Sequence, residues 1–137
     1  MTNWLFPYDS KKFKLDECLE EFGFVEWHQL NKFKVGDILY FYATAPVRRI
    51  THKMKVVKIN IEPTQGIDDS KYLTDLYDIK LKSDPKTFRV ECVKKFKTLK
   101  LHVDELGKHG LKTKRIPPQK LTGDLLAYIE QTVSMTE

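Results

Sequence analysis

The chain has 137 residues, of which 24 are Lys or Arg and 19 are Asp or Glu, so its formal net charge is +5. Hydrophobic residues make up 41% and aromatic residues 12%, which excludes a disordered tail and suits one globular domain over residues 1–137. No apolar run reaches the roughly 18 residues of a membrane helix, and the N-terminus lacks the features of a signal peptide. We therefore expect a cytoplasmic protein.

The first 30 residues predict a short helix between two extended segments. Residues 3–8 are apolar and aromatic, which predicts a buried strand. Apolar residues at helical spacing predict a helix over 14–22, and Gly23 stands where a C-cap glycine belongs. Residues 24–30 predict a strand or an extended loop.

Two long strand-like runs follow. Residues 38–44, after the turn at Gly36-Asp37, are β-branched and aromatic and apolar on both faces, which predicts a central strand. Residues 49–61 alternate between apolar and polar side chains. The phase of this alternation shifts at Val56-Val57, which predicts a β-bulge or bend.

The second half of the chain mixes strands with short helices. Residues 62–76 predict an irregular insertion, and residues 77–82 and 87–97 alternate as strands do. A brief helix is expected over 101–111, and a final amphipathic helix over 123–133. Strands and helices do not alternate strictly, so the sequence predicts a small α+β domain built on a curved sheet or barrel.

The sequence lacks the local motifs of common enzymes. It has no phosphate-binding glycine loop, no GxSxG nucleophile motif and no zinc-protease or deaminase motif. Cys18 and Cys92 are far apart without a CxxC pair, which predicts two buried thiols and no disulfide or metal site. The histidines also lack ligand spacing, and each is expected on the surface or in a strand: His28, His52, His102 and His109. We therefore expect no catalytic site, metal or cofactor.

The charges are unevenly distributed along the chain. Basic residues gather at 11–14, 94–100 and 108–120, whereas acidic residues gather at 16–26 and 62–78. Two interpretations remain open for this pattern. It is either a solvated surface or the contact face for a polyanion.

Aromatic residues are concentrated in the first 42 positions. Most are expected in the core. Tyr40 and Tyr42 should share one face of their strand, opposite Phe41, and buried phenol hydroxyls need hydrogen-bond partners. Trp27 has polar neighbours, including Gln29, and a tryptophan in such company suits the stacking of a flat heterocycle.

These residues carry a resemblance to the EVE domain, a PUA-like family related to the YTH readers of modified RNA. The resemblance rests on W-x-x-P at Trp4, V-E-W-H-Q around Trp27, V-G-D-I-L-Y-F-Y-A-T-A-P over 35–46, and the strand K-V-V-K-I-N-I. It implies a curved mixed β-barrel of five or six strands with short flanking helices. The form Y-F-Y-A-T-A-P is similar to modules fused to nucleases in modification-dependent restriction, which implies either a free-standing protein or the reader module of a larger one.

The resemblance also implies a mechanism, in which an aromatic pocket holds one extruded, modified base. On this hypothesis Trp27 is the main stacking wall and Tyr8 and Tyr42 are the other walls. Asp9, Gln29 and Thr44 would form hydrogen bonds to the edge of the base. The predicted phosphate-binding residues are Lys11, Lys12, Arg48, Arg49, Lys112, Lys114 and Arg115.

Four functions remain open on the sequence alone. The first is a reader of methylated or hydroxymethylated DNA in phage defence, with a nuclease domain or subunit as a partner. The second is a reader of modified RNA. The third is a PUA-like protein of the ASCH type that binds a small ligand, and the fourth is an interaction domain with a filled core. We favour nucleic acid as the partner, DNA over RNA, and no membrane.

Overall fold

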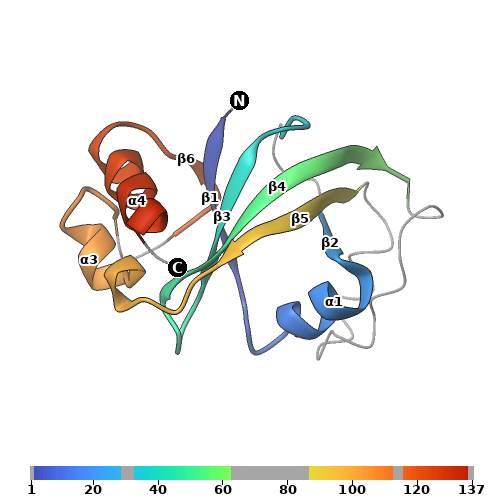
Figure 1. The fold of residues 1–137 in the computed structure, drawn as a ribbon, viewed down its shortest axis with the longest axis horizontal. Coiled ribbons are helices and arrows are strands. Elements are labelled where there is room, and N and C mark those ends of the chain that lie inside the picture. Colours follow the sequence, from blue (N-terminus) through green and yellow to red (C-terminus); the bar gives the residue numbers. More distant parts are fainter. Residues whose placement is uncertain (1, 29–32, 63–86, 113–115, 136–137) are drawn as a thin grey trace.

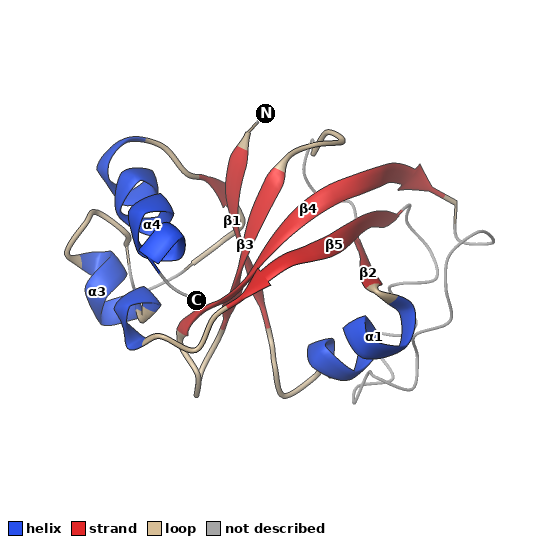
Figure 2. Ribbon diagram, viewed as in Figure 1, coloured by secondary structure: helices blue, strands red, loops and turns tan. Residues whose placement is uncertain are grey.

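The computed structural model describes residues 2–28, 33–62, 87–112 and 116–135 (Figure 1). In chain order the elements are β1 (Asn3–Tyr8), α1 (Leu15–Phe22), β2 (Phe24–His28), β3 (Ile38–Ala43), β4 (Arg49–Ile61), β5 (Thr87–Lys95), the 3-10 helix η3 (Leu99–Leu101), α3 (Val103–Gly107), β6 (Gln119–Lys120) and α4 (Gly123–Met135). Figure 2 shows the helices in two groups, with α1 beside β2 and with α3 and α4 together at the other end of the sheet.

The described strands form one mixed sheet in the order β2-β5-β4-β3-β1-β6. Strands β1 and β3 run parallel, and the other neighbouring strands are antiparallel. The predicted α+β class with a curved mixed sheet and short helices is confirmed. Within the described residues, however, β2 and β6 end the sheet without pairing to each other, so the expected barrel is an open sheet.

Four predicted strands are confirmed, the segment 24–30, expected as a strand or an extended loop, contains strand β2, and one strand was not foreseen. The runs at 3–8, 38–44, 49–61 and 87–97 correspond to β1, β3, β4 and β5. The two-residue strand β6 pairs with β1 and has no alternating pattern of its own, because a strand of this length cannot show one. The expected insertion at 62–76 and the expected strand at 77–82 lie outside the described residues.

The sheet buries side chains on both faces, and the alternation along β3 separates two cores. One face carries the aromatic core, which includes Trp4, Phe6, Tyr8, Phe13, Val25, Leu39, Phe41, Met54 and Phe88. The other face packs against α3 and α4 in the helical core, which includes Leu5, Tyr40, Tyr42, Ile50, Phe96, Leu106 and Ile129. Every residue of β3 is buried, as expected of a central strand.

The predicted helices are confirmed with changed bounds. Helix α1 ends at Gly23, whose φ of 78° is left-handed and whose N–H donates to the carbonyl of Leu19. The brief helix expected at 101–111 is shorter and follows a 3-10 turn. Among the helices of the described ranges, none has the length and apolarity needed to cross a membrane.

The prediction of two buried thiols is half wrong. Cys18 is buried in the aromatic core, whereas Cys92 is exposed. The difference arises along β5, where Phe88 and Val90 are buried in the aromatic core but the strand is exposed from Glu91 to Val93, so Cys92 lies beyond the end of that core.

Strand β4 contains the predicted bulge and further irregularities that the sequence did not reveal. The pairing with β5 shifts between Val56 and Lys58, which confirms the first. On the side of β3, Phe41 pairs with His52 and the next residue pairs with Ile50, so Thr51 is the extra residue. Thr51 and His52 are both buried, although neighbours in a regular strand point to opposite faces.

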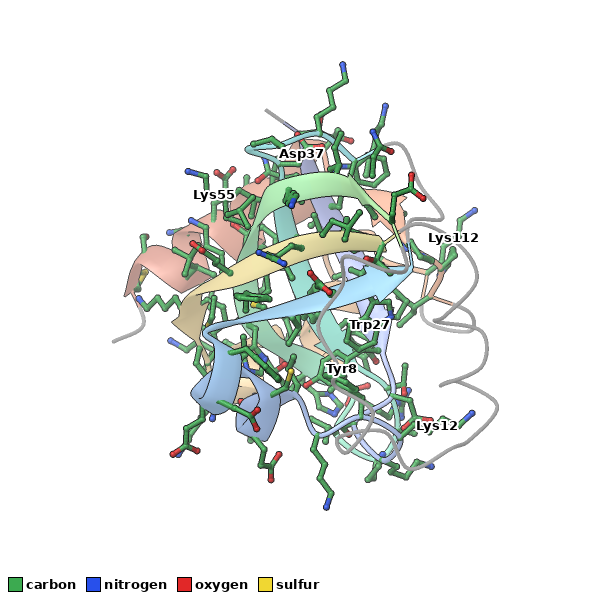
Figure 3. The ribbon with its side chains drawn as sticks, turned by 90° about the vertical axis from the view of Figure 1, so that its right-hand side faces the viewer. Tyr8, Lys12, Trp27, Asp37, Lys55 and Lys112 are labelled. Atoms are coloured by element: carbon green, nitrogen blue, oxygen red, sulfur yellow. The ribbon has the colours of Figure 1, made fainter. Side chains whose placement is uncertain are left out.

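The turn before β3 is held by one buried carboxylate. Asp37 accepts hydrogen bonds from the backbone N–H of Thr2 at 3.0 Å, from the indole N–H of Trp4 at 3.1 Å and from the backbone N–H of Lys34 at 3.0 Å. Figure 3 shows Asp37 at the top of the sheet. This residue therefore fixes the starts of β1 and β3 relative to each other.

Candidate functional site

A pocket of about 340 Å³ lies where the end of β1, the start of α1, the start of β4 and the end of β5 meet. We call it the Tyr8 pocket. Its volume falls within the range of small-molecule sites, roughly 300–1,000 Å³. The polar and charged side chains that line it include Tyr8, Asp16, Arg49, Thr51, His52, Lys95 and Lys97.

Side chains from four elements form a continuous hydrogen-bonded chain along this pocket. The Tyr8 hydroxyl lies 2.9 Å from Thr51 Oγ1, which lies 2.6 Å from His52 Nδ1. His52 Nε2 lies 2.9 Å from Asp16 Oδ1, and Lys95 Nζ lies 2.9 Å from Asp16 Oδ2. The bulge at Thr51 makes this chain possible, because it turns two consecutive side chains toward the same face.

The environment sets the charge of each member. Burial lowers the pKa of His52, and the hydrogen bond and charge of Asp16 only partly oppose this effect. Burial disfavours ionisation of Asp16, but hydrogen bonds from Lys95 and His52 outweigh it and lower the pKa of the carboxyl. Burial raises the pKa of Tyr8, partly offset by its bond to Thr51. Near neutral pH this hydrogen-bonded chain therefore contains a neutral His52 imidazole, an ionised Asp16 carboxylate and a protonated Tyr8 phenol.

Two of the predicted stacking residues lie together. The rings of Tyr8 and Trp27 meet edge to face at 6.4 Å between centroids, and Figure 3 shows them as neighbours. Trp27 also contacts Phe13 at 4.9 Å, and Phe6 and Phe41 at 5.8 Å each. The half-buried indole thus packs against the aromatic core, and its role in stacking a base stays a prediction.

The placement of Tyr42 with Tyr8 and Trp27 is wrong. Tyr42 belongs to the helical core on the opposite face of the sheet, because alternation along β3 places it with Tyr40 and away from Phe41. Its pKa is raised by burial and is partly lowered again by a hydrogen bond with Arg48. Arg48 is therefore placed beside Tyr42 and does not line the Tyr8 pocket.

Two of the three predicted edge-binding residues, Asp9 and Thr44, lie beside the pocket. Asp9 Oδ1 accepts a hydrogen bond from the backbone N–H of Lys11 at 2.9 Å. The backbone N–H of Thr44 donates to the carbonyl of Tyr8 at 3.0 Å. Their sequence neighbours Ser10 and Ala43 line the pocket itself. Gln29 lies outside the described residues.

The predicted phosphate-binding residues that the structure describes are dispersed. Arg49 lines the pocket, and its Nη1 donates to the carbonyl of Phe96 at 2.8 Å. Lys11 and Lys12 are exposed in the segment after Tyr8, and in Figure 3 Lys12 appears below Tyr8 whereas Lys112 appears well above it. Lys112 is exposed, and Lys114 and Arg115 lie outside the described residues.

Sequence reasoning missed most of the polar chain. His52 was expected to be an ordinary surface or strand histidine, yet it is 2% exposed and bonded at both ring nitrogens. The one available indication was the alternation of the strand, which placed His52 on the same apolar face as Met54 and Val56. Nothing local connects Asp16 or Lys95 to it, because they come from α1 and β5.

A second hollow, of about 500 Å³, lies between η3, α3 and the last turns of α4. Tyr128 lines it and donates its hydroxyl proton to the carbonyl of Lys100 at 2.6 Å. The charged side chains that line it are Lys100 and Glu105, neither of which is buried. The Tyr8 pocket, with its buried imidazole, is the better candidate for a specific ligand. Within the described residues no cluster of metal-ligating side chains is present.

The fold is an α+β domain on one open mixed sheet, and the Tyr8 pocket lies at one end of it. No protein-family model matches the chain, and no curated protein matches it. Solved structures match over nearly their whole length. A hypothetical protein from Leishmania major is 23% identical, with 98% of this chain and 96% of that chain covered and a TM-score of 0.66.

Two further structures share the fold. Human THYN1, solved in complex with DNA that contains 5-methylcytosine, is 16% identical, with 100% of this chain and 99% of that chain covered and a TM-score of 0.64. An ASCH protein from Zymomonas mobilis is 11% identical, with 99% and 96% covered and a TM-score of 0.65. At these identities the likeness shows the fold alone.

Proposed function

We propose that this protein is a nucleic-acid-binding module that holds one extruded base, methylated or hydroxymethylated, in the Tyr8 pocket. The observation that carries the proposal is the pocket itself, in which a buried polar chain lies beside Arg49, Lys95 and Lys97. Polar groups in a partly apolar pocket suit the edge of a base, and cations around it suit the flanking phosphates. The DNA complex of human THYN1 supports the same class of ligand.

The finer assignment is DNA rather than RNA, in restriction or phage defence, with a nuclease as effector. It rests on the resemblance to EVE modules fused to nucleases. The Tyr8 pocket takes over the role first given to Tyr8, Trp27 and Tyr42 together, since Tyr42 lies on the other face. Tyr8 remains a wall of the site, and Thr51 and His52 become the polar groups nearest to it.

A fluorescence titration tests this function, with the tryptophans as reporters. The ligands are duplexes with cytosine, 5-methylcytosine, 5-hydroxymethylcytosine, adenine or N6-methyladenine at one position, each at two salt concentrations. We expect tighter binding to one modified duplex and weaker binding at higher salt. Equal, weak binding to all duplexes would contradict the proposal.

The same titration separates the alternatives. RNA strands of the same sequence test the modified-RNA function, because only RNA offers the 2′-hydroxyl. Binding of a free nucleoside that does not change with salt would instead indicate a small-ligand protein, since no phosphate would be contacted.

Lys97→Gln should weaken the electrostatic part of binding without changing base preference. Lys97 is exposed and lines the pocket. Loss of one phosphate contact is expected to reduce the slope of log K against log salt by about 1 for all sequences alike. Lys108→Gln is the matched control, because Lys108 pairs with Glu105 on α3. Equal slopes for both variants would remove Lys97 from the interface.

A further inference from the structure

The donor and the acceptor of each hydrogen bond in the Tyr8 pocket can be assigned, starting from the charged residue Asp16. Asp16 is ionised and therefore only accepts hydrogen bonds. It receives Lys95 at one oxygen and His52 Nε2 at the other, each at 2.9 Å. His52 must consequently carry its proton on Nε2.

The remaining protons follow from this one. A neutral imidazole has a single N–H, so His52 Nδ1 is an acceptor, and Thr51 donates its only hydroxyl proton to it over 2.6 Å. Thr51 Oγ1 can then only accept from Tyr8 over 2.9 Å. The Tyr8 hydroxyl has thus used its proton inside the protein and offers a ligand only its oxygen lone pairs.

We propose that the Tyr8 hydroxyl selects a base with a hydrogen-bond donor at this point, the exocyclic amino group of a cytosine- or adenine-type base. This inference rests on the proposed function and names the base class that the pocket accepts. A base with a carbonyl group in the same place would set two acceptors against each other. Each would be left buried without a donor, which is costly.

The charge beside Tyr8 supports the same base class. Arg49 lines the pocket, its charge acts on the Tyr8 hydroxyl, and its guanidinium group carries five N–H donors. In cytosine and adenine a ring nitrogen that accepts hydrogen bonds lies next to the amino group. An acceptor from Tyr8 and a donor from Arg49 therefore match the two adjacent groups of that edge.

The test compares two bases of nearly equal shape. One duplex carries 5-methylcytosine and the other carries thymine at the same position, each opposite an abasic site, so that extrusion breaks no base pair in either. Thymine has a carbonyl group where 5-methylcytosine has its amino group. Because an unpaired buried polar group costs roughly 1–3 kcal/mol, we expect the wild type to bind 5-methylcytosine about 5- to 150-fold more tightly.

Tyr8→Phe removes the acceptor and keeps the ring, so it should reduce this preference to about 3-fold or less while the salt-dependent binding remains. Tyr128→Phe is the matched control, since its hydroxyl donates to Lys100 in the other hollow, and it should keep the full preference. Circular dichroism and a thermal melt establish that both variants fold.

The outcomes separate the two proposals. Equal binding of both bases by the wild type, or a preference for thymine, would overturn the selection by Tyr8 and leave nucleic-acid binding in place. A full preference that survives in Tyr8→Phe would also overturn it. Absence of salt-dependent binding to any duplex would overturn the proposed function itself.

Discussion

Phe41→Ala is expected to lower the free energy of unfolding by about 3–5 kcal/mol, the range for removing a large ring from a core. Phe41 is fully buried on the central strand β3. Its ring stacks on Phe6 at 5.1 Å between centroids and contacts Tyr8 at 5.7 Å and Trp27 at 5.8 Å. Loss of this ring leaves a cavity in the middle of the aromatic core, and domains of ordinary stability have only about 5–15 kcal/mol in total.

Urea unfolding followed by tryptophan fluorescence measures this change. Leu99→Ala is the control, because Leu99 is 72% exposed and its truncation should change stability by about 0.5 kcal/mol or less. A loss below about 1 kcal/mol for Phe41→Ala would contradict the central position of this ring. Since Phe41 contacts Tyr8, the same variant should also weaken any ligand binding at the Tyr8 pocket.

Asp37→Ala is expected to cost about 2–4 kcal/mol of unfolding free energy. Asp37 is 3% exposed, and its carboxylate accepts hydrogen bonds from Thr2, Trp4 and Lys34. Removal of the carboxylate leaves the buried indole N–H of Trp4 and the backbone donors without an acceptor, at roughly 1–3 kcal/mol for a fully buried group. Asp104→Ala is the control, because the Asp104 side chain is 79% exposed.

The same residue predicts a pH dependence. Burial opposes ionisation of Asp37, but the hydrogen bonds from Thr2, Lys34 and Trp4 outweigh it and lower its pKa below the ordinary 3.8. A lowered pKa in the folded state means that the stabilisation is complete above the unfolded pKa and is lost as pH falls through the folded pKa. Urea unfolding from pH 7 to pH 2 should show a steeper acid loss in the wild type than in Asp37→Ala. Parallel curves would contradict this role.

The strands could be predicted because they depend on local patterns. Ile38–Ala43 form a fully buried strand because all six side chains are apolar or aromatic, and four of them are β-branched or aromatic. The faces of that strand were also foreseen, since Tyr42 was expected opposite Phe41. The sequence could not show which residues pack against each face of this strand. Tyr8 packs with Phe41, and this depends on the parallel register of β1 with β3.

The polar chain of the site depends on a bulge and on long-range contacts. The alternation of 49–61 suggested that Ile50, His52 and Met54 share a face, whereas Ile50 belongs to the helical core and Met54 to the aromatic core. The extra residue Thr51 causes this switch between the two faces of the sheet. A threonine at that position does not by itself predict a bulge. Asp16 and Lys95 then reach His52 through the packing of α1 and β5, which local spacing does not encode.

The position of β1 has a consequence for synthesis on the ribosome. This strand emerges first, but it lies between β3 and β6, and the carbonyl of Asn3 accepts from the backbone N–H of Leu121. One edge of β1 therefore stays unpaired until residues 119–121 have left the exit tunnel. Such non-local pairing makes folding slow, and an unpaired apolar edge is prone to aggregation. We expect the nascent chain to complete this sheet only after residues 119–121 have emerged, and to need protection of β1 until then.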